Sequence, residues 1–181
     1  MPGPQFFHVQ TYAQKANQAG QSVEQVLAEA ARDPQFSQHV AAPRPYRIIL
    51  GLPPEGVRLR HDEMVTAGGV TVTLKDGKMA RRGIRKDRHT LLTAVASHPH
   101  LSSQIVADPM TRAEYEAWVG RNVGFLRDLF GDRLVSVIEH VDEDHPHVHA
   151  YILPLDDPAC SARNLNPAWV AKAEAEAAAR S

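Results

Sequence analysis

Residues 140–154, HVDEDHPHVHAYILP, gather the side chains of this sequence that could bind a metal ion. The stretch holds four histidines and three carboxylates, in a chain with ten histidines in all. In a strand, residues i and i+2 point to the same face, about 7 Å apart along the backbone. His147 and His149 therefore aim two imidazoles at one point. Together with His140 they predict a site for a borderline divalent ion, with positions left open for water or substrate.

The placement of His140 depends on how its strand pairs with the next one. His140 ends the preceding strand, and it shares a face with His147 only if an even number of unpaired residues separates the two strands. Glu143 or Asp142 could add a carboxylate ligand, or a hydrogen bond that orients a histidine. We expect His145, in the loop, to lie outside the ligand set. A closed structural zinc site is the alternative interpretation.

Composition and charge narrow the class of protein. The chain has 181 residues and a formal net charge of -1, so no global field favours a nucleic-acid partner. Its single cysteine, Cys160, excludes an intrachain disulfide framework and a thiolate metal cluster. No apolar run approaches the roughly 20 residues of a membrane span. The N-terminus also lacks the regions of a signal peptide. We therefore expect a cytoplasmic protein without a membrane segment.

Apolar periodicity predicts an α+β domain. The first helix should begin at Ser22 and end at Pro34, and a longer one should open with a capping box of Thr111 and Glu114 and close at Gly131. Strands are predicted at residues 6–12, 46–51, 89–99, 133–141 and 147–154, and a hairpin at 69–83. We expect a mainly antiparallel central sheet of about five strands, with helices packed on one side.

The end of the chain differs in composition from the rest. Residues 156–181 form a polar segment followed by a helix, which should be capped by Asn166 and begin at Pro167. Its apolar face is small, and no stop signal ends it. We expect residues 1–155 to form the functional domain, and residues 156–181 to lead into a longer native protein.

The histidine motif also carries a resemblance to a known family. The pattern H-x-D-E-x-x-P-H-x-H-x-x-x-x-P, which spans His140 to Pro154, resembles the metal motif of the MobV relaxases. These are the plasmid mobilisation and recombination (Mob/Pre) proteins of the HUH endonuclease group. Three further stretches, FFHVQTYAQKA, EAARDPQFSQHVAAPRPYRIILG and HTLLTAVASHP, are similar to the proteobacterial branch. The similarity covers residues 6–154.

The resemblance implies a relaxase domain of the HUH type. Such a domain is a metal-dependent enzyme that nicks one DNA strand at a specific site, by transesterification, and stays covalently attached to the DNA during conjugative mobilisation. The histidines that match the motif, His140, His147 and His149, would hold Mn²⁺ or Mg²⁺ against the scissile phosphate. The implied partner is single-stranded or hairpin DNA at an origin of transfer, with accessory relaxosome and coupling proteins. The implied location is the bacterial cytoplasm.

The nucleophile is the point at which the sequence departs from the family pattern. The best-studied branch of the MobV family uses a histidine on the first helix, three positions before an arginine. Counting back from Arg32 leads instead to Glu29. The leading candidates here are His39, in a Pro-rich loop, and Tyr12, because tyrosine is the usual HUH nucleophile. Two further candidates are His8, which has strand parity with Tyr12, and Tyr46, which reads as a packed strand residue. Glu143 completes the predicted catalytic set.

A basic segment predicts where DNA would be held. Within KMARRGIRKDR, six cations stand against one acid, Asp87. Such a density on a nearly neutral protein is typical of a phosphate-binding arm. A solvated flank of the hairpin is the alternative. The six cations are Lys78, Arg81, Arg82, Arg85, Lys86 and Arg88.

Two other functions remain open from the sequence. HPHVHAY also resembles the signature of histidine-triad nucleotide hydrolases and transferases, although Pro146 stands where that signature has an apolar residue. The second alternative is a relaxase-like protein that binds metal and DNA but no longer nicks. Glu29, in place of the expected histidine, keeps that alternative open.

Overall fold

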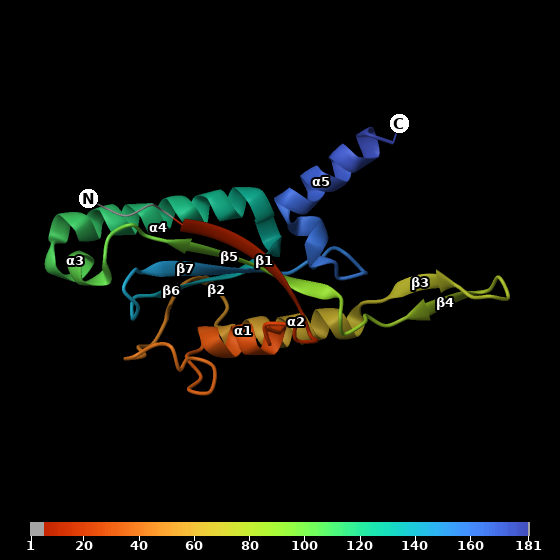
Figure 1. Cartoon of the computed structure of the whole chain (residues 1–181), viewed down its shortest axis with the longest axis horizontal. Coiled ribbons are helices and arrows are strands. Elements are labelled where there is room, and N and C mark those ends of the chain that lie inside the picture. Colours follow the sequence, from red (N-terminus) through yellow and green to blue (C-terminus); the bar gives the residue numbers. More distant parts are fainter. Residues whose placement is uncertain (1–5, 181) are drawn as a thin grey trace.

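A five-stranded antiparallel sheet forms the centre of the computed structural model, which describes residues 6–180 (Figure 1). All neighbouring strands are antiparallel. The predicted fold class, α+β with a mainly antiparallel sheet, is therefore confirmed. The strands follow the order β1 (Phe6–Ala13), β5 (His89–Ser97), β7 (His147–Ile152), β6 (Leu134–His140) and β2 (Arg47–Gly51).

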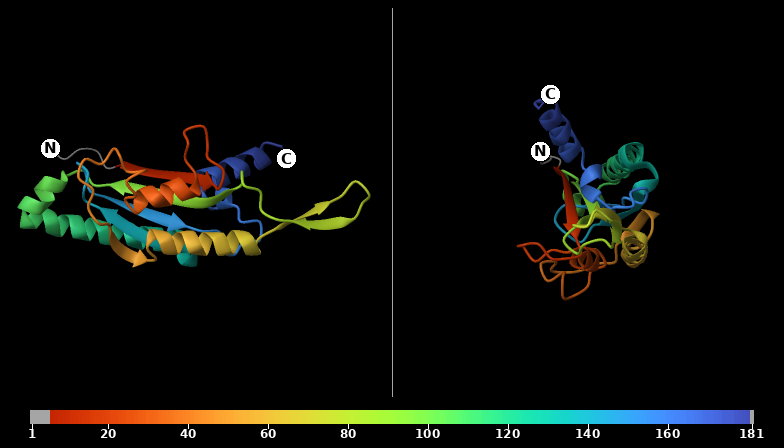
Figure 2. Two further views of the ribbon diagram at one scale, coloured as in Figure 1. Left: turned by 90° about the horizontal axis from the view of Figure 1, so that it is seen from below. Right: turned by 90° about the vertical axis from the view of Figure 1, so that its right-hand side faces the viewer.

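Helices cover both faces of this sheet, as the end view in Figure 2 shows. One face packs against α4 (Pro109–Phe130), and the other against α1 (Val23–Ala30) and α2 (Pro54–Ala67). The expectation of helices on one side was wrong. The physical reason lies in the central strands, where Leu91 and Leu92 point to opposite faces and are both fully buried.

Two helix boundaries also differ from the prediction. The first helix, α1, ends at Ala30 rather than at Pro34, because Arg32 adopts a left-handed backbone conformation with φ 61°. The side chain of Asp108 caps α4 and Pro109 occupies its first turn, so the predicted capping box of Thr111 and Glu114 was wrong. The predicted end of α4 at Gly131 is confirmed.

The prediction from the sequence left several elements unassigned. Of these, α2 is the most important, because it buries Pro54, Val57 and His61 against the sheet. Only three residues of its fourteen are buried, so its apolar stripe is too thin to stand out in the sequence. The others are α3 (Ser102–Ala107) and the 3₁₀ turns η1 (Gly131–Arg133) and η2 (Ala162–Leu165).

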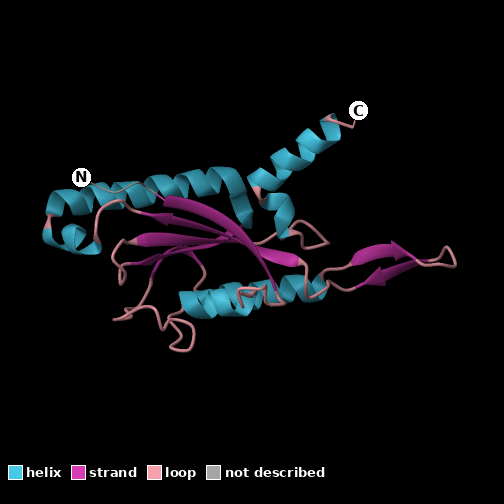
Figure 3. Cartoon of the chain, in the orientation of Figure 1, coloured by secondary structure: helices cyan, strands magenta, loops and turns pink. Residues whose placement is uncertain are grey.

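Two parts of the chain extend away from the sheet (Figure 3). The predicted hairpin is confirmed as β3 (Val70–Thr73) paired with β4 (Met79–Arg82), and it projects from one end of the molecule. The last helix, α5 (Pro167–Ala178), begins as predicted after the Asn166 cap and buries none of its residues. Before it, Ala162 is fully buried against the sheet. None of the described helices has the length and apolarity that crossing a membrane requires.

Candidate metal centre and nucleic-acid interface

The three motif histidines meet at one end of the sheet. His140, the last residue of β6, pairs directly with His147, the first residue of β7, and six residues separate them. The even loop length therefore puts both on one face, and the predicted register is confirmed. His149 lies on the same face, two residues along β7. One nitrogen from each of the three rings lies within 4.8 Å of the other two.

Hydrogen bonds to backbone carbonyls select which ring nitrogens are free. A carbonyl oxygen only accepts, so Nε2 of His140 must donate to the oxygen of Ala30 at 2.9 Å. Its Nδ1 is buried and has no hydrogen-bond partner among the described residues. In His147, Nδ1 donates to the oxygen of His145 at 3.1 Å, which leaves Nε2 as the lone-pair donor. Such bonds fix tautomer and ring orientation as they do in metal sites.

Burial and neighbouring charges keep two of these rings, His140 and His149, neutral. Burial, with a smaller contribution from the nearby Arg32, lowers the pKa of His140 to about 4. Burial lowers the pKa of His149 well below its usual range, and the neighbouring His147 and His140 add to this effect. A neutral imidazole is the form that binds a metal ion. His140 and His149 are therefore uncharged nitrogen donors, which suit a divalent cation better than a proton.

The acids of the motif are held by an arginine from α1's end. The Arg32 guanidinium lies 2.6 Å from Asp142 and 2.9 Å from Glu143, and the Asp142 carboxylate is fully buried. Burial alone would raise the pKa of Asp142, but hydrogen bonds from Arg32 and from the Arg44 amide lower it. Glu143 lies 3.6 Å from Nε2 of His147. Of the two predicted acids, Glu143 is therefore the one that reaches a motif histidine.

Among the candidate nucleophiles, His39 contacts Glu29, the residue three positions before Arg32. Its Nε2 lies 3.5 Å from the Glu29 carboxylate, and both side chains are about half exposed. Glu29 directly precedes Ala30, whose carbonyl accepts the hydrogen bond from His140. The structure thus brings the glutamate and a histidine together, and the glutamate is one residue from the carbonyl that contacts His140.

The tyrosine candidates occupy different positions. Tyr12 is buried in the core between the sheet and α1, and burial raises the pKa of its phenol. Tyr46 is half-buried and packs edge-on against the His140 ring, with 6.5 Å between centroids. Its hydroxyl lies 3.4 Å from Glu55. His8 is exposed on the edge strand, in register with Val95, which in turn pairs with His149. The nucleophile stays a prediction.

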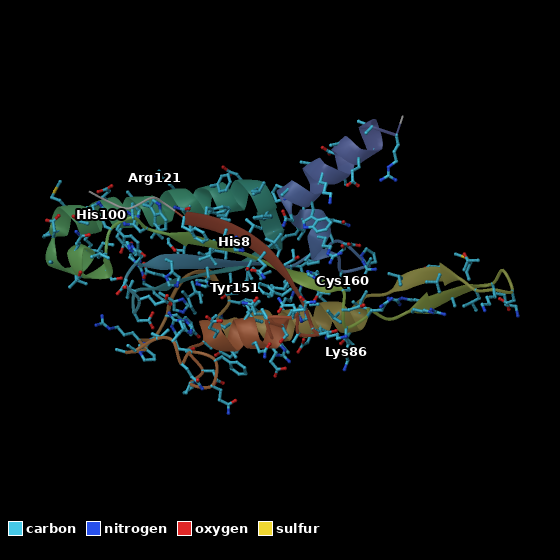
Figure 4. The ribbon with its side chains drawn as sticks, in the orientation of Figure 1. His8, Lys86, His100, Arg121, Tyr151 and Cys160 are labelled. Carbon is cyan, nitrogen blue, oxygen red and sulfur yellow. The ribbon has the colours of Figure 1, made fainter. Side chains whose placement is uncertain are left out.

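The basic residues lie at the opposite end of the sheet from the histidine cluster. In Figure 4, Lys86 lies near the foot of the hairpin, whereas His100, just beyond the end of β5, lies at the far end. Five of the six cations are exposed and Arg88 is half-buried. Among the described residues, three of these side chains form polar contacts within the chain: Lys78 with Asp76, Arg81 with the carbonyl of Ala67, and Arg85 with Asp87. The DNA-binding assignment stays a prediction.

Sequence reasoning missed two partners of the cluster. Arg32 served only as a marker for counting, yet its side chain anchors the acidic loop. The carbonyl of Ala30 sets the tautomer of His140. A backbone carbonyl carries no residue signature, and the Arg32 contact spans 110 positions of sequence. Only the fold could place either of them.

Comparisons with known proteins address the fold. No family model matches the chain, and no curated protein matches it. Among solved structures, the chain is similar to the MobM relaxase domain (MOBV; Mob_Pre) bound to 26-nucleotide pMV158 oriT DNA, with a TM-score of 0.51. The fold is that of a relaxase domain. The match covers 92% of this chain and 78% of that one at 10% sequence identity, so the similarity concerns the relaxase fold alone.

Proposed function

We propose that this chain is a metal-dependent DNA relaxase, which nicks one strand at an origin of transfer for mobilisation of a plasmid or other mobile element. The observation that carries the proposal is the cluster of His140, His147 and His149, with its free nitrogens converging at one end of a relaxase fold. The similar MobM domain was solved with oriT DNA. Because that domain was solved with DNA, the similarity supports DNA as the substrate of this chain.

The residues of the cluster fit a divalent ion. The buried, unpartnered Nδ1 of His140 and the free Nε2 of His147 are the groups that a cation would satisfy. His149 would provide the third nitrogen. Three protein ligands leave positions open for a substrate oxygen. When bound, Mn²⁺ or Mg²⁺ neutralises phosphate charge and orients the phosphate for in-line attack.

His39 is the nucleophile that the geometry favours, with Glu29 as its partner. Nε2 of His39 lies 3.5 Å from the Glu29 carboxylate, and a proton on that nitrogen would leave Nδ1 with its lone pair for attack. A bond forms between Nδ1 and phosphorus while the bond between phosphorus and the 3′-oxygen breaks. The 3′-oxygen leaves with the electron pair and takes a proton from solvent. The charge that develops on the imidazole is stabilised by the Glu29 carboxylate.

Tyr12 fits this role less well than His39. It is buried in the core, and its raised pKa opposes formation of the phenolate. Attack by Tyr12 would require α1 to move away from the sheet. Tyr46 is closer to the cluster, because it packs on the His140 ring, but its hydroxyl faces Glu55. Such a half-exposed ring is better suited to stacking on a base than to attack.

The test is covalent capture of DNA. The protein is incubated with labelled single-stranded DNA from the transfer origin of its own mobile element, with Mn²⁺ or with a chelator, and separated under denaturing conditions. We expect a manganese-dependent protein–DNA band that is lost in His39→Ala and kept in Tyr12→Phe. Glu29→Gln should slow its formation by at least about tenfold.

The bond type gives an independent check. A phosphorus–nitrogen adduct on His39 hydrolyses in acid, whereas a phosphotyrosine ester survives. An acid-stable band, or one that persists in His39→Ala, would reject His39 as the nucleophile. Peptide mapping of the band would then name the residue.

A nicking-deficient DNA-binding protein is the second candidate. It is favoured by Glu29 at the position where the resemblance implies a histidine. If DNA and metal are both retained but no variant or wild-type protein forms the adduct, this second function replaces the first.

A further inference from the structure

A basic cleft lies at the foot of the β3–β4 hairpin. It is lined by Arg85, Asp87, Arg88, His89, Ser161 and Arg163. These residues come from two segments far apart in the chain, the linker that leads into β5 and the turn η2. A third segment joins them, because the amide of Lys15 donates to the carbonyl of Lys86 at 2.7 Å.

The cations of this cleft are only partly neutralised. Asp87 is the single acid in its lining, and it pairs with Arg85 at 2.6 Å. Within the described part of the chain, Arg88 and Arg163 have no carboxylate within 4.0 Å, although both line the cleft. Arg163 is also close enough to His89 to lower the pKa of that ring, after the larger effect of burial. Folding therefore holds two unpaired guanidinium groups at one opening.

The surroundings hold Arg163 in place. Its guanidinium carbon lies 5.1 Å from the centre of the Trp169 ring of α5, which is a cation–π contact. The adjacent Ala162 is fully buried against the sheet and anchors η2. This contact gives a role to α5, which buries none of its own residues. Arginine is the side chain best shaped to bind a phosphate through several N–H groups at once.

We propose that this cleft is a second phosphate-binding site, which takes the sugar–phosphate backbone of DNA at a distance from the histidine cluster. The inference rests on the proposed function for the identity of its ligand. It adds His89, Ser161 and Arg163 to the basic segment recognised in the sequence, and it makes Arg88 and Arg163 the principal contacts.

The spacing between the two sites predicts what the cleft contacts. The strand β5 runs from His89 at the cleft to Ser97, which pairs with His147 of the cluster. Its nine residues span roughly 26 Å at about 3.3 Å per residue. That separation equals about eight base pairs of duplex DNA at 3.4 Å each. The cleft therefore engages DNA well away from the scissile phosphate and adds affinity without touching the reacting atoms.

The salt dependence of DNA affinity tests this site. The dissociation constant of a mixed-sequence single-stranded oligonucleotide of about 24 nucleotides is measured at several salt concentrations, for the wild-type chain and for Arg88→Gln/Arg163→Gln. Each lost phosphate contact lowers the slope of log affinity against log salt by about 0.7 for single strands, so the double variant should lose about 1.4. Affinity at low salt should fall by roughly tenfold or more.

The control is Arg127→Gln, which removes an exposed arginine of α4 that does not line the cleft. It loses one positive charge, so its slope shows how much a general loss of charge contributes. The double variant loses two charges, so a general charge effect would change its slope by about twice as much as in the control. A change no larger than that would contradict the proposed phosphate site.

Covalent capture of origin DNA, measured on the same proteins, separates this proposal from the proposed function. If the wild-type chain forms the manganese-dependent adduct but the double variant has the wild-type salt dependence, the proposal of a phosphate site in the cleft is wrong and the relaxase function stands. If no adduct forms but the double variant loses slope, nicking is wrong and the cleft stands. A chain that binds no oligonucleotide overturns both.

Discussion

At the scale of single residues, Arg32 connects the end of α1 to the loop that carries the histidine motif. Its backbone has a positive φ of 61°, which is uncommon for a residue other than glycine. Its buried guanidinium contacts both acids of the motif, and the carboxylate of Asp142 also accepts from the Arg44 amide. A left-handed arginine persists only when its surroundings determine it strongly. Here the ion pair of Arg32 with Asp142 and Glu143 holds the residue in this conformation.

Removing the charge of Asp142 should therefore destabilise the whole chain. In Asp142→Asn the Arg32 guanidinium keeps its ion pair with Glu143 but loses the charge of its buried partner. Breaking a buried ion pair lowers the free energy of unfolding by on the order of 3 kcal/mol. The free energy of unfolding in urea measures this loss. Asp144→Asn is the matched control, because Asp144 is an exposed acid of the same loop. Equal stability of the two variants would show that the pair contributes little.

At the scale of elements, α2 is attached to the sheet through one buried polar ring. His61 is fully buried, with Nε2 at 2.7 Å from the Thr90 hydroxyl and Nδ1 at 3.0 Å from Asp62. Burial lowers the pKa of His61, and the pairing with Asp62 opposes this only in part. The folded state therefore holds this histidine neutral at a pH where the unfolded chain already binds a proton.

This difference makes the stability of the fold depend on pH in a defined direction. At a pH above about 6.5, the pKa of His61 in the unfolded chain, the histidine is neutral in both states and does not destabilise the fold. Stability is lost as the pH falls below that value towards the lower pKa of His61 in the folded state. In His61→Gln the free energy of unfolding should fall less steeply with decreasing pH than in the wild-type chain. The two slopes should differ by up to about 1.4 kcal/mol per pH unit, which is the effect of one proton. Urea unfolding of both proteins between pH 7.5 and 5.5 (roughly one unit on each side of the free pKa) measures it. Parallel curves would mean that His61 does not titrate on unfolding.

The elements also show what sequence could and could not predict. The five strands, the hairpin and the shared face of His140 and His147 follow from local alternation and from an even loop, and all are confirmed. The second helical layer was missed, because α2 buries only three of its residues. The end of α1 was misplaced, because it is set by Arg32 and Asp142, which are 110 positions apart. Local patterns carry no information about such contacts.

At the scale of the whole molecule, the histidine cluster joins the last two central strands to α1. The strands β6 and β7 supply the rings, and the Ala30 carbonyl at the end of α1 holds His140 in place. Tyr151, labelled in Figure 4, follows His149 along β7 into the core between the sheet and α1, with 6.4 Å between the two ring centres. A cation bound at the cluster would therefore tighten the contact between sheet and helix layer as well as the site itself.

Metal binding should accordingly raise the stability of the whole chain. A ligand that binds only the folded state at one hundred times its dissociation constant adds about 2.7 kcal/mol. For a chain of this length, that corresponds to a rise of roughly 5–10 °C in unfolding temperature. Thermal unfolding of the chelator-treated protein, before and after addition of Mn²⁺ or Mg²⁺, measures the shift, and the larger shift at equal concentration identifies the preferred ion.

Two histidine variants assign this shift to the cluster. His140→Ala removes a nitrogen donor and should abolish the shift. His145→Ala removes a histidine from the same loop whose Nδ1 contacts the carbonyl of His98 instead, so the shift should remain. A shift that survives in His140→Ala would place the cation elsewhere on the molecule. Loss of the shift in both variants would mean that the loop as a whole, rather than the three converging nitrogens, holds the ion.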